Sequence, residues 1–289
     1  MLTGTLVSGL GLGSMYGLVA LGFHITFAVS GTVNFAQGSA VTLGAVLGYA
    51  FGVQLGWPMP LAAAAALAGC ALLGLAVERL LVRPFVARGS DAWLLATVAG
   101  GIILDNVLLF TFGKEPCSLP SPLVSAPVQI LGAGIYPLQL LIPVVGIAAA
   151  VAIRAVFRGT ELGRVLLAVA QNAEAARLMG IDVARTVACA FALSAVLAGA
   201  AGLLIAPLFS VSAEMGALFG IKAFAVAILG GIGSATGVVL AGLLYGLVEA
   251  GVTATLGSGA TQIVVFSVII LALALRPNGL LGRAAVNKV

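Results

Sequence analysis

Residues 5–29, TLVSGLGLGSMYGLVALGFHITFAV, form an apolar run long enough to cross a bilayer as one helix, which takes about 20 residues. No Asp, Glu, Lys or Arg occurs between residues 1 and 77. This stretch is too long for one span. The Gly, Asn and Pro residues of SGTVNFAQGS (30–39) and QLGWPMP (54–60) predict the turns that divide it. The first part of the chain therefore predicts a protein that crosses a membrane several times.

The composition of the whole chain supports the same fold class. Of the 289 residues, 62% are hydrophobic and 8% are charged, whereas soluble domains have about 45–50% and about 25%. Continuous apolar runs also argue against an outer-membrane barrel. We predict an all-α polytopic membrane protein with one transmembrane domain over residues 1–289 and eight or nine helices, some short or broken. The nine predicted spans are 5–29, 39–53, 61–82, 92–112, 136–156, 184–206, 216–232, 236–256 and 260–276; re-entrant short spans would reduce the count to eight.

The basic residues predict the orientation, because cytoplasmic loops carry an excess of Lys and Arg. Three regions hold 11 of the 13 basic residues and are expected inside: Arg79, Arg83 and Arg88; Arg154, Arg158, Arg164, Arg177 and Arg185; and Arg276, Arg283 and Lys288. The proline-rich loop 113–135 is expected outside, together with the amino terminus. The net charge of +4 then reflects cytoplasmic loops, and we expect no nucleic-acid partner.

Two similar segments suggest an internal repeat. SGTVNFAQG and LGGIGSATG each end an apolar run with glycines seven residues apart, Gly31 with Gly38 and Gly230 with Gly237. Both junctions face the cytoplasm in the predicted orientation, which would make the repeats parallel. Chance recurrence in a glycine-rich membrane protein explains the pattern equally well.

Glycines spaced four apart predict flat helix faces on which another backbone can pack closely. A lining role in a substrate path is the alternative for one of these stripes. The predicted packing glycines are Gly9, Gly13 and Gly17; Gly44, Gly48 and Gly52; and Gly230, Gly231, Gly233 and Gly237.

Polar residues inside apolar spans are candidates for a transport path, since ionisable groups in hydrocarbon are costly and face a bundle interior or cavity. Glu249 is predicted as a lone carboxylate in mid-span, with a structural or subunit-interface role and a place in the path both open. For Asp105 and Lys222 two positions stay open: facing the bundle interior, a cavity or a partner, or lying near span ends and reaching the interface. The path candidates are His24, Asn34, Gln37, Asp105, Asn106 and Glu249.

The charged segment 154–185 predicts a structured cytoplasmic region of a helix and a turn, with Gly180 as a helix stop. A solvated connector is the simpler interpretation, but a connection between spans needs only a few residues. A region of this size favours contact with another protein.

The sequence contains no GxxxxGK[ST] phosphate loop and no GxSxG, HExxH or CxxC motif. It predicts no catalytic residue, metal site or cofactor. Energy must then come from another chain or from an ion gradient.

Five segments together resemble the permease subunits of branched-chain amino acid ABC importers, and the chain looks like the smaller of the two sister permeases. The segments are GLGSMYGLVALGF (11–23), VNFAQGSAVTLGA (33–45), FGKEPCSLPSP (112–122), AQNAEAARLMGIDVAR (170–185) and IKAFAVAILGGIGSATGVVLAGLLYGLVEA (221–250).

This resemblance implies a multi-pass protein of a bacterial or archaeal cytoplasmic (inner) membrane. The implied partners are membrane lipid, a sister permease, two ATP-binding subunits and a periplasmic or lipid-anchored substrate-binding protein. It also implies that a coupling segment at about 157–183 docks on the ATPase. Within it, the family motif matches Glu174, Ala175, Ala176, Arg177 and Gly180, but its usual Ile-x-Leu-Pro ending is absent, because residues 190–193 are AFAL.

The substrate stays open at this point. Relatives in the resembled family carry branched-chain and other amino acids, urea or short amides. An ion-coupled secondary transporter or a channel is the alternative from another class. It would need no coupling segment and would carry more ionisable residues at the membrane midplane.

Overall fold

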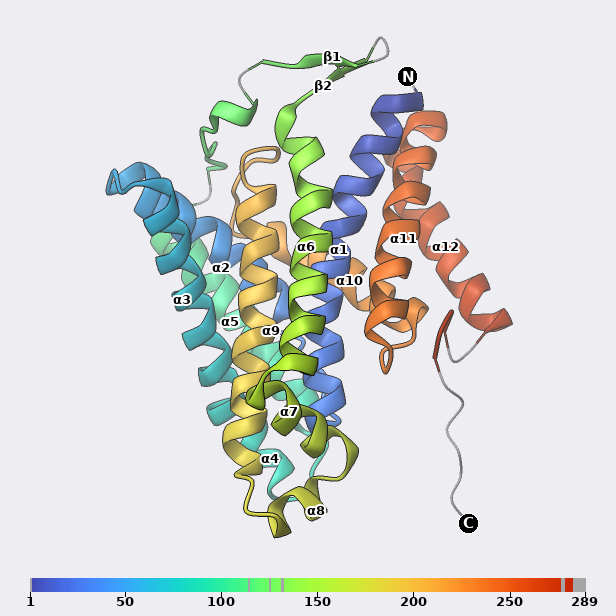
Figure 1. Cartoon of the computed structure of the whole chain (residues 1–289). Helices are drawn as coiled ribbons and strands as arrows, with labels where there is room; N and C mark the ends of the chain where they lie inside the picture. Colours follow the sequence, from blue (N-terminus) through green and yellow to red (C-terminus); the bar gives the residue numbers. More distant parts are fainter. Residues whose placement is uncertain (1, 114, 125, 131–132, 277–278, 283–289) are drawn as a thin grey trace.

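The computed structural model describes residues 2–113, 115–124, 126–130, 133–276 and 279–282. Lys114, Arg283 and Lys288, which entered the predicted orientation, lie outside this part. The chain is almost entirely helical and confirms the all-α polytopic fold (Figure 1). The α-helices are α1 (Leu2–Ser30), α2 (Gln37–Tyr49), α3 (Met59–Val77), α4 (Arg83–Val86), α5 (Trp93–Phe112), α6 (Pro137–Gly159), α7 (Glu161–Gln171), α8 (Ala173–Leu178), α9 (Val183–Ile205), α10 (Met215–Gly230), α11 (Ala235–Leu256) and α12 (Ser258–Leu275).

Seven helices of the described chain are long and apolar enough to cross a membrane. Two more predicted spans correspond to shorter helices, α2 with 13 residues and α10 with 16. Short π-helical segments extend two helices, at Ala50–Gln54 after α2 and at Glu78–Val82 between α3 and α4. All nine predicted spans are therefore helical, and two of them are short, as expected.

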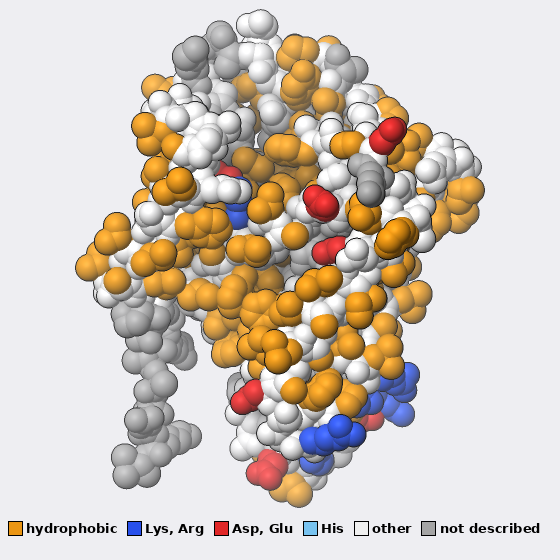
Figure 2. Space-filling view, turned by 180° about the vertical axis from the view of Figure 1, so that it is seen from behind, with side chains coloured by type: hydrophobic (Ala, Val, Ile, Leu, Met, Phe, Trp, Pro, Cys, Tyr) orange, Lys and Arg blue, Asp and Glu red, His pale blue; other side chains and the backbone are white. Residues whose placement is uncertain are grey.

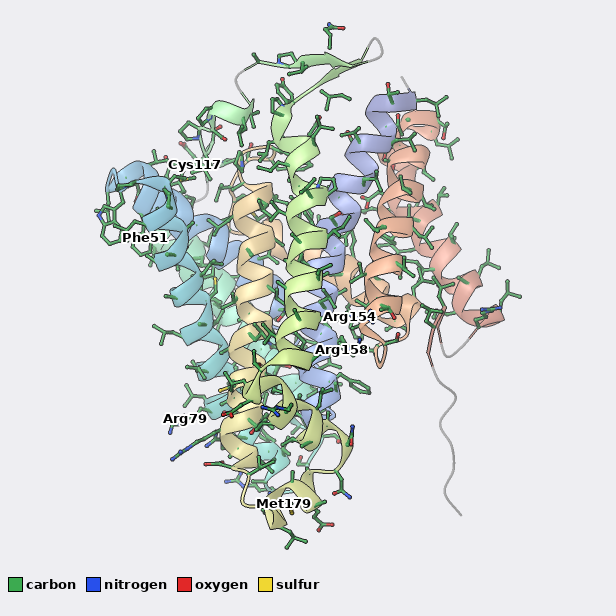
Figure 3. The ribbon with its side chains drawn as sticks, in the orientation of Figure 1. Phe51, Arg79, Cys117, Arg154, Arg158 and Met179 are labelled. Atoms are coloured by element: carbon green, nitrogen blue, oxygen red, sulfur yellow. The ribbon has the colours of Figure 1, made fainter. Side chains whose placement is uncertain are left out.

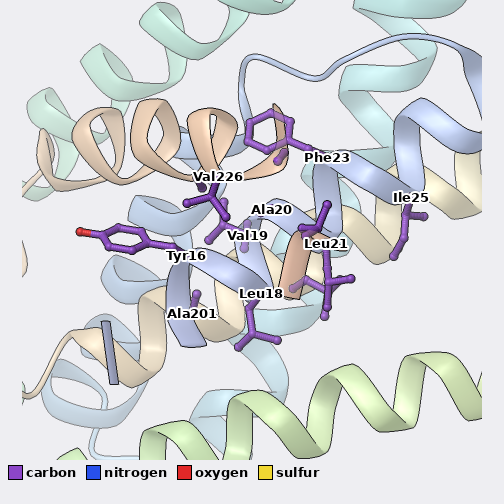
Figure 4. Packing of buried hydrophobic residues seen from close by; sticks show 14 of the residues in the cluster. Tyr16, Leu18, Val19, Ala20, Leu21, Phe23, Ile25, Ala201 and Val226 are labelled. Carbon is purple, nitrogen blue, oxygen red and sulfur yellow. The ribbon is translucent and has the colours of Figure 1, made fainter. Parts of the chain in front are cut away.

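Helix α1 is the centre of the molecule. It packs against α6, α9, α10 and α11, and its buried side chains point in every direction around the helix (Figure 4). Tyr16, Leu18 and Phe23 are each at most 2% exposed. A helix that is apolar on all sides is stable only when it is surrounded, and α1 meets that requirement within its own chain. By contrast, most of α5, α6 and α12 is exposed in this chain.

The loop between α5 and α6 contains structure that the sequence did not predict. It holds a 3-10 turn at Pro122–Val124 and an antiparallel hairpin of β1 (Val128–Ile130) and β2 (Ala133–Ile135). Cys117 in this loop pairs with Val211 of the α9–α10 connection through two backbone hydrogen bonds of 2.7 and 2.9 Å. The two loops thus close one end of the molecule together.

Charge separates the two ends of the molecule. The hairpin and the start of α1 lie at one end, and α4, α7 and α8 lie at the other (Figure 1). On the face shown in Figure 2, Lys and Arg side chains gather at this second end below a broad hydrophobic belt. This arrangement agrees with a cytoplasmic position for α4, α7 and α8.

The two segments of the suggested repeat have similar local geometry. Gly31 after α1 and Gly231 after α10 adopt positive φ angles of 68° and 85°, which favour glycine. Gly38 and Gly237 lie in the first turns of α2 and α11. The duplication itself stays a prediction.

Candidate functional site

Two opposite charges meet between α1, α10 and α11. Lys222 Nζ donates to Glu249 Oε1 at 2.5 Å and to the Tyr16 hydroxyl at 3.4 Å. Glu249 is 7% exposed, and the ammonium lies 5.7 Å from the centre of the Tyr16 ring. Glu249 is therefore paired within its own chain, and of the two positions left open for Lys222, the one near a span end is wrong. Lys222 lies in the middle of α10, and its long side chain reaches across to α11.

The short helices α2 and α10 cross near their amino-terminal ends. Gly38 and Gly216 meet there so closely that a Cβ on either would overlap the backbone of the other. The Thr42 hydroxyl of α2 accepts a hydrogen bond from the Gly216 amide of α10 at 2.9 Å, which satisfies one of the free amides at that helix start. Two broken spans are thereby held together inside the bundle.

A cavity of about 350 Å³ opens beside this crossing, between α1, α2, α5 and α10. Its walls are mainly apolar and include three aromatic rings, of which Phe224 contacts the other two: its ring centre lies 5.5 Å from that of Phe23 and 5.1 Å from that of Phe35. Asp105 of α5 also lines the cavity, and its buried Oδ1 has no hydrogen-bond partner in the described part of the chain. This cavity combines an apolar wall with one carboxylate at membrane depth.

Two other path candidates are used for internal hydrogen bonds. Gln37 is fully buried and exchanges two hydrogen bonds of 3.0 Å with Ser194, which tie α2 to α9. Asn34 is 1% exposed, and its Oδ1 accepts from the Ala36 amide at 3.1 Å in the turn before α2. These contacts favour a structural role for both residues.

The remaining path candidates lie apart from this cavity. His24 Nδ1 is 2.7 Å from the Ile232 carbonyl and links α1 to the α10–α11 turn. Asn106 lies on the exposed face of α5, where its amide donates to the Ile102 carbonyl at 2.8 Å. Of the six candidates, the cavity brings in only Asp105.

The charged segment 154–185, for which the sequence predicts a cytoplasmic position, contains two capped helices after α6 rather than one. Thr160 caps α7 by accepting from the Gly163 amide at 3.0 Å, and Asn172 caps α8 by accepting from Ala175 at 2.9 Å. Side-chain oxygens at these positions start a new helix, so the chain turns at Asn172. Gly180 has φ of 83° and ends this helical unit, as the sequence predicts.

The expected docking alanines differ in exposure. Ala176 is 4% exposed and packs into the core of its own chain, so it cannot enter a groove on another protein. Glu174, Ala175 and Arg177 are exposed. The residues that follow, Leu178 and Met179, are 89% and 83% exposed, and Met179 lies at the tip of the molecule (Figure 3). Two apolar side chains in a charged loop were the signal that the sequence analysis missed.

The glycine stripes have different neighbours. Gly9, Gly13 and Gly17 face the α11 backbone, and Gly44 faces that of Gly199 in α9. Gly48 and Gly52 face the side chains of Leu203 and Met59 instead, which corrects the expected backbone contact there. Gly230 and Gly237 meet where α10 turns into α11, whereas Gly231 supplies the turn and nothing lies near Gly233, so Gly233 is not a packing glycine.

Within the described chain, no three His, Cys, Asp or Glu side chains cluster as metal ligands. The three cysteines, Cys70, Cys117 and Cys189, are unpaired. The candidate site therefore consists of an ion pair, an apolar cavity with an acid, and an exposed tip at Leu178 and Met179.

Comparison with known proteins shows to which family the chain belongs. A family model described as "Branched-chain amino acid transport system / permease component" matches residues 5–274. The chain belongs to this permease family. It is 32% identical to the high-affinity branched-chain amino acid transport system permease protein LivH of Escherichia coli (strain K12), with 98% of this chain and 96% of LivH covered. It is 33% identical to the permease protein BraD of Pseudomonas aeruginosa, with 98% and 97% covered.

The permease is thus a multi-pass membrane transport subunit and not an enzyme, and the resemblance drawn from the sequence is confirmed. A solved structure described as PsaBC from Streptococcus pneumoniae in complex with Fab has a similar fold. Its TM-score is 0.51 at 14% identity, covering 94% of this chain and 91% of that one. Permeases of this kind work with further permease, ATPase and binding-protein subunits.

Proposed function

We propose that this permease forms part of the membrane pathway of an ATP-driven importer for branched-chain amino acids in a bacterial or archaeal cytoplasmic membrane. A sister permease would complete the pathway, two ATPase subunits would drive it, and a periplasmic or lipid-anchored binding protein would deliver the substrate. Family membership and the missing phosphate loop support this assembly. The coupling segment, about residues 157–183, would be where the ATPase docks.

The exposed tip of α8 is the observation that carries the proposal. Leu178 and Met179 expose large apolar side chains beyond the basic end of the bundle, and in the predicted orientation this end lies in the cytoplasm. Exposed apolar side chains at such a position mark a protein interface. The Asn172 cap and the Gly180 turn hold this tip in a fixed shape. A fixed tip can transmit a movement of the ATPase to α7 and α9.

Substituting the tip residues tests this role. Fully burying a Leu or Met side chain is worth about 1.5–3 kcal/mol, so Leu178→Ser or Met179→Ser should weaken ATPase binding by about tenfold or more. Co-purification of the ATPase subunits and ATPase stimulation by the loaded binding protein measure the loss. Val86→Ser, which changes an exposed valine (45%) of α4 at the same end of the molecule but outside the coupling segment, is the control.

The outcomes separate the competing functions. Full ligand-stimulated ATPase activity in both tip variants would remove the tip from the coupling contact. Uptake by wild-type permease in vesicles without any ATPase subunit would instead support an ion-coupled carrier or channel.

The cavity beside Asp105 is the proposed substrate path. A branched-chain amino acid carries an ammonium group and an apolar side chain, and the cavity offers a carboxylate and aromatic walls. Its volume lies within the about 300–1,000 Å³ of small-molecule sites. Asp105 would pair with the ammonium, while Phe35 and Phe224 would contact the side chain. Urea and short amides lack the ammonium, so they would gain nothing from this carboxylate.

Asp105→Asn keeps the shape of the side chain and removes its charge. We expect leucine uptake to fall at least tenfold, because a charge-assisted hydrogen bond is worth about 1.5–3 kcal/mol. Asn106→Leu, on the outer face of the same helix turn, should transport normally. Uptake of radiolabelled leucine and of urea by the reconstituted complex measures both. Unchanged leucine uptake in Asp105→Asn would exclude this carboxylate from the path.

A further inference from the structure

A second cavity, of about 340 Å³, lies at the basic end of the molecule between α1, α6, α7 and α11. Arg154 and Arg158 of α6 line it together with His24 of α1 and Thr236 in the first turn of α11. Both arginines lie on the lower part of α6, beside the α10–α11 turn (Figure 3). Phe157, Arg158 and Leu167 of its lining fall within the proposed coupling segment, but the cavity includes neither the exposed tip nor Asp105.

The cavity carries uncompensated positive charge. Arg154 and Arg158 are four residues apart, so they lie on the same face of α6. The ion pairs of the described chain involve Arg83, Arg164, Arg185 and Lys222, and neither cavity arginine has a carboxylate within 4.0 Å among the described residues. The amino-terminal end of α11 adds the partial positive charge of its free amides. An anion therefore fits this end of the cavity.

Further along the bundle, α1, α6 and α11 line a second, shallow hollow of only about 10 Å³. Its apolar lining includes Leu21 of α1, Ala150 and Ile147 of α6, and Val239 and Leu243 of α11. Helix α1 packs on both α6 and α11 and forms the floor between them. The surface thus has a basic part at the end of the bundle and an apolar part along the helices. A phospholipid in a bilayer has the same order of headgroup and acyl chains.

We propose that this surface, the lipid groove, binds an anionic phospholipid of the cytoplasmic leaflet. Its phosphate would sit between Arg154 and Arg158, whose guanidinium groups bind phosphate through paired hydrogen bonds. An acyl chain would follow α1 between α6 and α11. Basic pockets between transmembrane helices on this side of a membrane hold such headgroups. The bound lipid would fill the space between α6 and α11 and hold α7 against the bundle.

Lipid titration of the purified complex tests the proposal. Delipidated complex is titrated with phosphatidylglycerol or with phosphatidylcholine of the same acyl chains, and native mass spectrometry counts the bound lipid. We expect wild type to prefer phosphatidylglycerol by about tenfold and Arg154→Gln or Arg158→Gln to lose that preference, since one charge-assisted contact is worth about that factor. Arg79→Gln removes an exposed arginine outside the cavity, and it should retain the preference.

Three results would overturn the proposal. The first is an unchanged preference in both cavity variants. The second is displacement of the lipid by soluble glycerol phosphate at equal concentration, which would mean that the site binds a free anion and that the groove contributes nothing. The third is unchanged lipid binding combined with loss of the ATPase subunits in Arg154→Gln and Arg158→Gln, which would assign the arginines to a protein carboxylate.

Discussion

Lys222 and Glu249 bring a charged pair into a region that is otherwise apolar. Burial of two charges costs several kcal/mol each, and their attraction offsets this cost only when the geometry is good. Here the ammonium contacts Glu249 Oε1 and the Tyr16 hydroxyl, while Glu249 Oε2 and the Tyr245 hydroxyl have no hydrogen-bond partner in the described chain. The pair therefore fixes the positions of α1, α10 and α11 relative to one another more than it adds stability.

Removing one charge should be more harmful than removing both. Lys222→Met or Glu249→Gln alone leaves an unpaired polar or charged group and should destabilise the permease by up to about 3–5 kcal/mol. The double variant should recover most of this loss. The yield and melting temperature of the monodisperse complex measure it. A loss in the double variant equal to the sum of the two single losses would mean that the two residues act independently.

The polar residues inside the membrane spans could be identified from the sequence, but the residues that they contact could not. Lys222 and Glu249 stand out because charges are rare in apolar spans. Their pairing was not predictable, because Glu249 lies further from the intervening turn than Lys222 does, and the contact depends on how α10 packs against α11. Asp105 was also found as a candidate because it is a charge in an apolar span. The aromatic side chains that line its cavity were not found.

Helices α1 and α11 form a tight interface through matched glycines. Gly9 and Gly13 of α1 cross Gly242 and Gly246 of α11 with their backbones in contact. The α1 stripe was predicted from its spacing of four. Its partner in GLLYG (242–246) has the same spacing but was not singled out. Without side chains at the crossing, dispersion contacts between backbones hold the helices together.

Gly246→Ala tests this interface against a control on the same helix. A Cβ at Gly246 would overlap the backbones of Gly9 and Gly13, whereas nothing lies within 4 Å of one at Gly251. We expect Gly246→Ala to cost about 1–3 kcal/mol through overpacking and Gly251→Ala to gain up to about 1 kcal/mol of helix stability. The melting temperatures of the two variants should shift in opposite directions. Equal shifts would contradict tight α1–α11 packing.

Helices were more predictable than their connections. Apolar runs and turn residues predicted all nine helical spans to within a few residues, because a bilayer span needs a minimum length. The β1–β2 hairpin in the loop 113–135 was missed, since its strands are three residues each and are too short for a periodic pattern to identify them. The division of the cytoplasmic segment at Asn172 depended on a single side-chain cap.

The two ends of the molecule differ in charge. The hairpin end has few charges, whereas α4, α7 and α8 carry arginines (Figure 2). The proposed coupling tip and lipid groove both require this second end to face the cytoplasm. The amino terminus would then lie outside. A single measurement of orientation therefore bears on both proposals.

Cysteine labelling in intact cells makes that measurement. In a background without native cysteines, Gln129→Cys on the exposed hairpin should react with a membrane-impermeant thiol reagent, and Glu161→Cys at the start of α7 should react only after the cells are permeabilised. Both positions are exposed in the structure, so access to the reagent depends on the side of the membrane and not on burial. Equal labelling of the two variants after permeabilisation is the control. The reverse pattern would place α7 and α8 outside, where neither an ATPase nor a cytoplasmic-leaflet lipid could reach them.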